Sequence, residues 1–286
     1  MVSLMPVSFS NEPEILVVHG VQTGENQDMR QNEVIKETLD KLIADPALHF
    51  ETAFEFTTKI LAYEDINDDA SYLVRRILAS MTGNSIAGWV VDEAADLISD
   101  VLLAISQGDV YEAVKARIKN EIQLAHSQGR PVYLVAHSLG SFYALEVIND
   151  LMANWGMAKS DKSFWPVHGL ITIGSPLGLS LFKRDHSHLN RRKIGVNVTS
   201  KPRFPWKNYW DRQDPIVTGN IMGFPRQSDF PIRFDRQMAK RKGWNIRVEE
   251  VNAGHTAHLG AHTAYWHDST VGQGIVNMLY VDKENY

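Results

Sequence analysis

The sequence has no cysteine among its 286 residues. Disulfides and thiolate metal ligands are therefore excluded, which fits a reducing compartment. The first residues lack a cationic segment followed by a long apolar one, so we expect no Sec-type signal peptide and a cytoplasmic location. Repeats and low-complexity segments are also missing. Because 44% of the residues are hydrophobic, we expect one globular domain over residues 1–286.

The sequence also lacks an uninterrupted apolar run long enough to span a membrane. The longest candidate, residues 86–105, is interrupted by four acidic residues: Asp92, Glu93, Asp96 and Asp100. These acids lie mostly on one side of a helical projection and aliphatic residues lie on another, which predicts an amphipathic helix over a core or a site. Residues 179–205 show no clear periodicity. Segments 70–108 and 179–205 are the candidates for a small helical cap or lid.

Positive charge is concentrated in one part of a chain whose net charge is −5. Between Lys183 and Lys242 there are fifteen Lys or Arg against five Asp, so this segment carries +10 and the remainder carries −15. Such a segment can attract an anionic lipid surface or a phosphate-bearing substrate. Because clustering along the chain does not establish clustering in space, a solvated surface is the simpler interpretation. A nucleic-acid partner is not expected.

Short, continuously apolar segments alternate with helical patterns along the chain. Strands are predicted at 14–18, at 56–63, before Ser138, at 169–173 and at 246–251. Helices are predicted from Asp109 to Gly129, from Ser138 to Gly156 and over 269–280. This alternation is typical of a mostly parallel central sheet with helices on both faces. Functional sites in such sheets lie at the carboxyl ends of the strands.

Residues 132–141, VYLVAHSLGS, predict a strand that turns sharply into a helix at Ser138. Such a nucleophile elbow presents the serine hydroxyl away from the sheet, beside a base and backbone N–H donors. It requires small residues two positions before and after the serine, where Ala136 and Gly140 stand. We therefore take Ser138 as the candidate nucleophile. An ordinary βα turn with a buried serine is the alternative.

A serine nucleophile needs a histidine base and an acid that orients the histidine, and with this elbow they follow in the order serine, acid, histidine. Asp214 is the first candidate acid, because it begins the sequence Asp-Pro-Ile-Val, whose proline stiffens the turn. Asp211 is the second candidate. Either aspartate could instead simply cap the turn.

Three histidines follow the last predicted strand. His262 is the candidate base, because it precedes the aromatic pair Tyr265 and Trp266 and the terminal helix. His258 is the second candidate and His255 the third. Their spacing also resembles a metal-binding loop, but no nearby carboxylate or cysteine completes a ligand set, so no metal is expected.

Acyl transfer also needs backbone N–H groups that bind the developing oxyanion. Leu139, at the start of the elbow helix, is one candidate donor. Val21 is the other, because it follows His19 and Gly20 at the end of the first predicted strand.

The chain resembles the lipases and esterases of the α/β-hydrolase superfamily in five places. These are Val18-His19-Gly20, Ala136-His137-Ser138-Leu139-Gly140, Gly174-Ser175-Pro176, Asp214-Pro215-Ile216-Val217 and His262. The resemblance covers about residues 14–280. It implies the α/β-hydrolase fold and a serine hydrolase that forms an acyl-enzyme and needs no cofactor. The chain departs from the family at Ala136, where the pattern has Gly. We also expect it to lack the first two strands of larger members, and it has no long glycine run of the kind that some esterases place after His-Gly.

The leading functional hypothesis is a carboxylic-ester hydrolase acting on a lipid or another acylated small molecule. Thioester hydrolysis, amide hydrolysis and acyl transfer use the same residues, so each stays open. A binding or scaffold protein that kept the fold without catalysis is the alternative from a different class.

Overall fold

The computed structural model describes residues 12–20, 28–45, 56–61, 109–154, 165–176, 205–214, 217, 246–251, 261–262 and 264–281. Six strands form one sheet in the order β2-β1-β3-β4-β5-β6, and every neighbouring pair is parallel. The strands are β1 (Glu14–Val18), β2 (Thr57–Ile60), β3 (Val132–His137), β4 (Val167–Ile173), β5 (Trp206–Trp210) and β6 (Ile246–Glu250). The predicted parallel α/β class is confirmed.

Four α-helices and two short helical turns accompany the strands in the described ranges. They are α1 (Asp28–Ile43), α4 (Asp109–Ser127), α5 (Gly140–Asn154), the 3₁₀ turn η5 (Tyr265–His267), α10 (Ser269–Val276) and the π-helical turn η6 (Asn277–Val281). Asp268 caps α10, because its side chain accepts hydrogen bonds from the N–H groups of Thr270 and Val271. The terminal helix predicted over 269–280 is therefore present as α10 followed by η6.

Two strand boundaries differ from the sequence prediction. β2 ends at Ile60, shorter than the predicted 56–63, and β4 begins at Val167, two residues before Gly169. Gly169 lies inside β4, at a place where a side chain would collide with the core. An added Cβ would lie 2.4 Å from the sulfur of Met278. This glycine therefore marks close packing and not a strand end.

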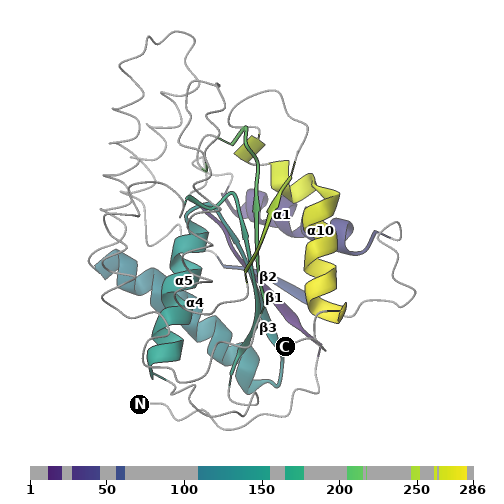
Figure 1. Cartoon of the computed structure of the whole chain (residues 1–286). Coiled ribbons are helices and arrows are strands. Elements are labelled where there is room, and N and C mark those ends of the chain that lie inside the picture. The colour runs from purple at the N-terminus through teal and green to yellow at the C-terminus, as the bar shows by residue number, and fades with distance from the viewer. Residues whose placement is uncertain are drawn as a thin grey trace, which may run out of the picture.

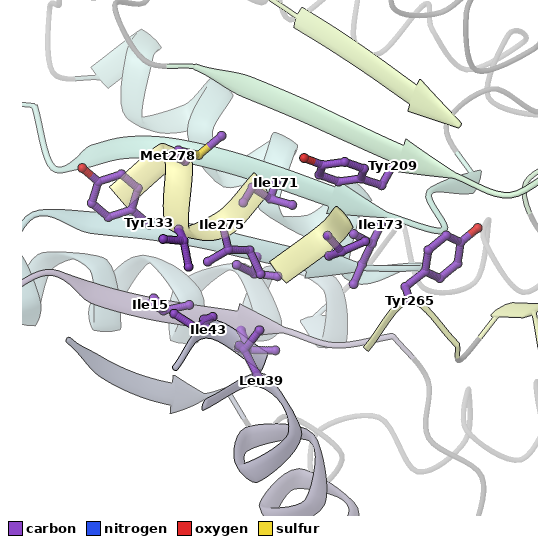
Figure 2. Close-up of a cluster of buried hydrophobic side chains, with 14 of the residues drawn as sticks. Ile15, Leu39, Ile43, Tyr133, Ile171, Ile173, Tyr209, Tyr265, Ile275 and Met278 are labelled. Carbon is purple, nitrogen blue, oxygen red and sulfur yellow. The ribbon is translucent and has the colours of Figure 1, made fainter. Parts of the chain in front are cut away.

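Helices cover both faces of the sheet (Figure 1): α4 and α5 lie on one face, and α1 and α10 lie on the other. All five residues of β1 are buried, as the parallel arrangement requires. Alternate residues of β1, β3 and β4 pack with α1 and α10 in one apolar cluster, part of which is drawn in Figure 2. Most of this cluster is fully buried, and it supports the strand ends from which the candidate site residues project.

Helix α5 approaches the sheet closely at its first residue, Gly140. A Cβ added there would lie 2.0 Å from the carbonyl oxygen of Val18 and 2.7 Å from that of His19. Only glycine permits this contact between α5 and the end of β1. The small residue that the elbow pattern requires after the serine thus has a steric reason in this chain.

Several sequence predictions fall on residues that the structure does not describe. These are the segments 70–108 and 179–205 apart from Pro205, and most of the basic segment 183–242. Two of its cations lie in the described ranges: Lys207 is buried and donates to the carbonyl of Gly274, and Arg212 pairs with Glu250. None of the helices in those ranges has the length and apolar character that a transmembrane helix needs.

Candidate active site

Ser138 stands at the carboxyl end of β3 with a backbone φ of 53°, in the left-handed region. Non-glycine residues rarely adopt this conformation, and among the described residues Ser138 alone does so. Its N–H donates to the carbonyl of Ile173 at 3.0 Å, which continues the pairing of β3 with β4. Helix α5 begins two residues later. The predicted sharp turn between strand and helix is therefore present.

The end of β1 lies against the serine side chain. A Cβ added to Gly20 would lie 2.6 Å from the Cβ of Ser138 and 3.1 Å from its Oγ. The neighbouring His19 is buried, and its Nδ1 donates to the carbonyl of Gly20 at 2.6 Å. Because Gly20 has no side chain, the backbone after β1 can lie this close to the side chain of Ser138.

His262 and Asp214 form a buried hydrogen-bonded pair. The Nδ1 of His262 lies 2.8 Å from Oδ2 of Asp214, and the aspartate side chain is fully buried. Since a carboxylate only accepts, Nδ1 carries the proton, and the Nε2 of a neutral His262 is then an acceptor. This tautomer is the one that a general base needs in order to take a proton from a serine hydroxyl.

Gly174, directly after β4, lies against the histidine–aspartate pair. Its φ is +56°, and a Cβ there would lie 3.1 Å from Oδ2 of Asp214 and 3.2 Å from Cε1 of His262. The preceding residue, Ile173, accepts the hydrogen bond from Ser138. Serine, aspartate and histidine therefore gather at the carboxyl ends of β3, β4 and β5. The chain has the α/β-hydrolase fold.

The two candidate acids occupy different environments. Oδ1 of Asp211 accepts the N–H of Gln213 at 2.7 Å, and its carbonyl accepts the N–H of Asp214 at 3.1 Å. This is the turn-capping arrangement that the sequence left open for either aspartate. Asp214 is the aspartate that contacts His262. The geometry thus gives Asp211 a structural contact and Asp214 a contact with the candidate base.

His137, the residue before the serine, holds the backbone of the candidate base. Its Nε2 donates to the carbonyl of His262 at 2.7 Å, and the two rings lie 4.6 Å apart. Burial, followed by the neighbouring His262, holds the pKa of His137 well below the ordinary histidine value of 6.5. His137 is therefore neutral near pH 7, with its proton on Nε2.

Two contacts were not recognised from the sequence. Tyr265 was expected only to pack near His262, yet its hydroxyl donates to Oδ2 of Asp214 at 2.8 Å. His137 was noted only as a neighbour of Ser138. The sequence offered only the position of each residue: His137 stands beside Ser138, and Tyr265 stands about one helical turn after His262. Position alone does not specify a hydrogen-bond partner.

The remaining predicted site residues either lie outside the described ranges or have a role that the structure does not test. Val21, His255 and His258 are among the undescribed residues. Leu139 is described and buried at the turn into α5, and its role as an oxyanion donor stays a prediction. In the part of the chain that the structure describes, no three His, Asp or Glu residues gather into a cluster that could hold a metal ion.

No family model matches the sequence. The chain is 26% identical over 206 residues to the phosphatidylcholine-sterol acyltransferase of Rattus norvegicus. That match covers 67% of this chain and 43% of the acyltransferase, so the chain spans less than half of that relative's length.

Solved structures that resemble the chain include three proteins of low sequence identity. Dienelactone hydrolase from Anabaena variabilis is 13% identical, with a TM-score of 0.39 over 95% of this chain and 87% of that one. Est1E from Butyrivibrio proteoclasticus is 10% identical, with a TM-score of 0.40 over 98% and 93%. A poly(3-hydroxybutyrate) depolymerase from Bordetella parapertussis is 17% identical, with a TM-score of 0.38 over 96% and 80%. The fold assignment rests on the strand order and the serine turn.

Proposed function

We propose that this chain is a serine hydrolase that cleaves carboxylic esters of lipids or other acylated small molecules through an acyl-enzyme. Ser138 is the nucleophile, His262 the general base and Asp214 the acid that orients His262. The observation that carries the proposal is the left-handed Ser138 together with a buried histidine–aspartate pair, whose His262 is hydrogen-bonded through its carbonyl to His137, the residue before the serine. An ordinary serine in a βα turn would not need the strained φ.

The proposed reaction uses the tautomer of His262 that its hydrogen bond to Asp214 favours. Nε2 of His262 takes the proton of the Ser138 hydroxyl while Oγ attacks the ester carbonyl carbon. The carbonyl oxygen becomes negative and is bound by the N–H groups of Leu139 and Val21. When the tetrahedral intermediate collapses, the bond to the alcohol oxygen breaks and His262 returns its proton to that oxygen. Water, activated by the same histidine, then releases the acid from the serine.

Acyl transfer is the second candidate function, and one comparison favours it. The relative that is 26% identical is an acyltransferase. An acyl-serine reacts with an alcohol by the same steps as with water, because His262 can deprotonate either one. The two functions share the first half-reaction and differ only in what attacks the acyl-enzyme.

The experiment compares Ser138→Ala with Ser141→Ala on a series of p-nitrophenyl esters of increasing acyl length. Ser141 is a matched control, because it is also buried, and its hydroxyl donates to the carbonyl of Ala136. Ser138→Ala should lower kcat by about 10⁴-fold or more, and Ser141→Ala should stay within a few fold of wild type. Activity in Ser138→Ala close to wild type would contradict the proposal.

Adding an alcohol acceptor to the same assay separates hydrolysis from transfer. A hydrolase gives the free acid as its main product, whereas a transferase gives the new ester. A wild-type protein without activity on any ester or thioester would favour the binding or scaffold alternative.

A further inference from the structure

The hydroxyl of Tyr265, three residues after His262, contacts both Asp211 and Asp214 in the turn after β5. It donates to Oδ2 of Asp214 at 2.8 Å and accepts the backbone N–H of Asp211 at 2.9 Å. The donor directions are fixed: since a backbone N–H can only donate, the phenol's own proton points to the carboxylate. Oδ2 of Asp214 therefore receives two hydrogen bonds, one from Tyr265 and one from His262.

The ring of Tyr265 packs close to Gly174 in the interior. The residue is fully buried, and its Cε2 would lie 2.9 Å from a Cβ at Gly174. Figure 2 shows Tyr265 at the edge of the apolar cluster, beside Ile173, with its hydroxyl directed away from the labelled aliphatic side chains. The tyrosine thus belongs to the core through its ring and to the candidate site through its oxygen.

We propose that Tyr265 is a positioning residue. Its hydroxyl holds the carboxylate of Asp214 in the orientation that the hydrogen bond to His262 requires, and it draws negative charge away from the oxygen that faces His262. The proposal rests on the proposed function of the same site. Without the phenol, Oδ2 of Asp214 would lose one of the two hydrogen bonds that hold the carboxylate against rotation about its Cβ–Cγ bond. Its negative charge would also be less shared, so it would stabilise the imidazolium form of His262 more strongly.

The phenol stays a donor throughout the assay range. Burial, and secondly Asp214, raise the pKa of Tyr265 well above its ordinary value of 10. The titratable groups around His262 in the described ranges are Asp214 on one side and His137 on the other, with His19 beside His137 and Asp211 beside Tyr265. Of these groups, only Asp214 accepts the hydrogen bond from the tyrosine.

The test is Tyr265→Phe, which removes one oxygen and leaves the ring in place. Tyr143→Phe is the matched control, because Tyr143 is equally buried but lies in α5 among Tyr111 and Phe142. We expect Tyr265→Phe to lower kcat by about tenfold or more, with little change in KM. The acid limb of its kcat/KM profile should move to higher pH. Tyr143→Phe should keep the wild-type rate and profile.

A readout without turnover keeps this proposal separate from the proposed function. The ring of His262 is followed by NMR against pH in wild type and in Tyr265→Phe, with His262→Ala used to assign the signal. A titration midpoint that moves upward in Tyr265→Phe supports the positioning role, even if the wild type cleaves no ester and the proposed function fails. An unmoved midpoint and acid limb would overturn the proposal, whatever happens to kcat.

Discussion

The side chain of His137 donates a hydrogen bond to the backbone carbonyl of His262 at 2.7 Å. The residue beside the candidate nucleophile therefore holds the segment that carries the candidate base. The two residues are far apart in the sequence and meet at the carboxyl end of β3. Because the donor is a buried neutral imidazole, the stability of the fold around this link depends on pH.

Acidification should destabilise the folded protein through His137. Burial lowers its pKa below 6.5, so at lower pH the unfolded state takes up a proton that the folded state resists. Stability is fully present above pH 6.5 and falls as the pH drops below it, by at most about 1.4 kcal/mol per pH unit for one histidine. The measurement is the free energy of unfolding by urea between pH 7 and 5.5.

His137→Gln tests this link, because glutamine has an N–H₂ donor but does not titrate in this range. The variant should show a flatter pH dependence and keep most of the wild-type activity. His126→Gln is the comparison, since burial also lowers the pKa of His126, which lies in α4. It should flatten the stability curve without changing the rate. An unchanged slope in His137→Gln would contradict the assignment of this histidine.

Gly174→Ala should reduce activity more than its loss of stability explains. Gly174 and Gly129 both have positive φ, at +56° and +71°, so alanine strains the backbone at either position by about 1–2 kcal/mol. Only the alanine at 174 would press on His262, Asp214 and Tyr265. We expect kcat to fall at least about tenfold in Gly174→Ala and to stay near wild type in Gly129→Ala. Equal rates at equal folded fraction would show that the histidine–aspartate pair tolerates the added methyl group.

Asp214→Asn and Asp211→Asn should have very different effects on kcat. An amide at 214 keeps the shape of the side chain but removes its charge and favours the wrong tautomer of His262, which costs about 10³- to 10⁴-fold. An amide at 211 retains an oxygen that can still accept the N–H of Gln213, so the turn and the rate should persist. Steady-state kinetics on one p-nitrophenyl ester give both numbers. A comparable loss in the two variants would mean that both act through the turn.

The sequence predicted the parallel sheet and its site-bearing edge because local patterns carry that information. Continuous apolar strands, the capping signals of the helices and the small residues around Ser138 all act within a few residues of one another. The start of β4 was predicted at Gly169, two residues after its position in the structure. Gly169 lies inside the strand, where the lack of a side chain leaves room for Met278, more than a hundred positions away.

The candidate site could be predicted in its residue types but not in its contacts. Turn chemistry ranked Asp214 above Asp211 as the candidate acid. The hydrogen bond that distinguishes them depends on how the turn after β5 and the residues around His262 meet in space. The hydroxyl of Tyr265 and the ring of His137 act across the same junction. Periodicity and spacing do not encode such long-range partners.

The most direct test of the account is to map the residue that a fluorophosphonate modifies, by mass spectrometry of the intact chain and of its peptides. Because only an activated serine reacts quickly with this reagent, we predict one adduct per chain, located on Ser138. The adduct should be absent in Ser138→Ala and should form at least about 100-fold more slowly in His262→Ala. An adduct on another residue, or a Ser138 adduct whose rate does not depend on His262, would contradict the central claim that His262 activates Ser138.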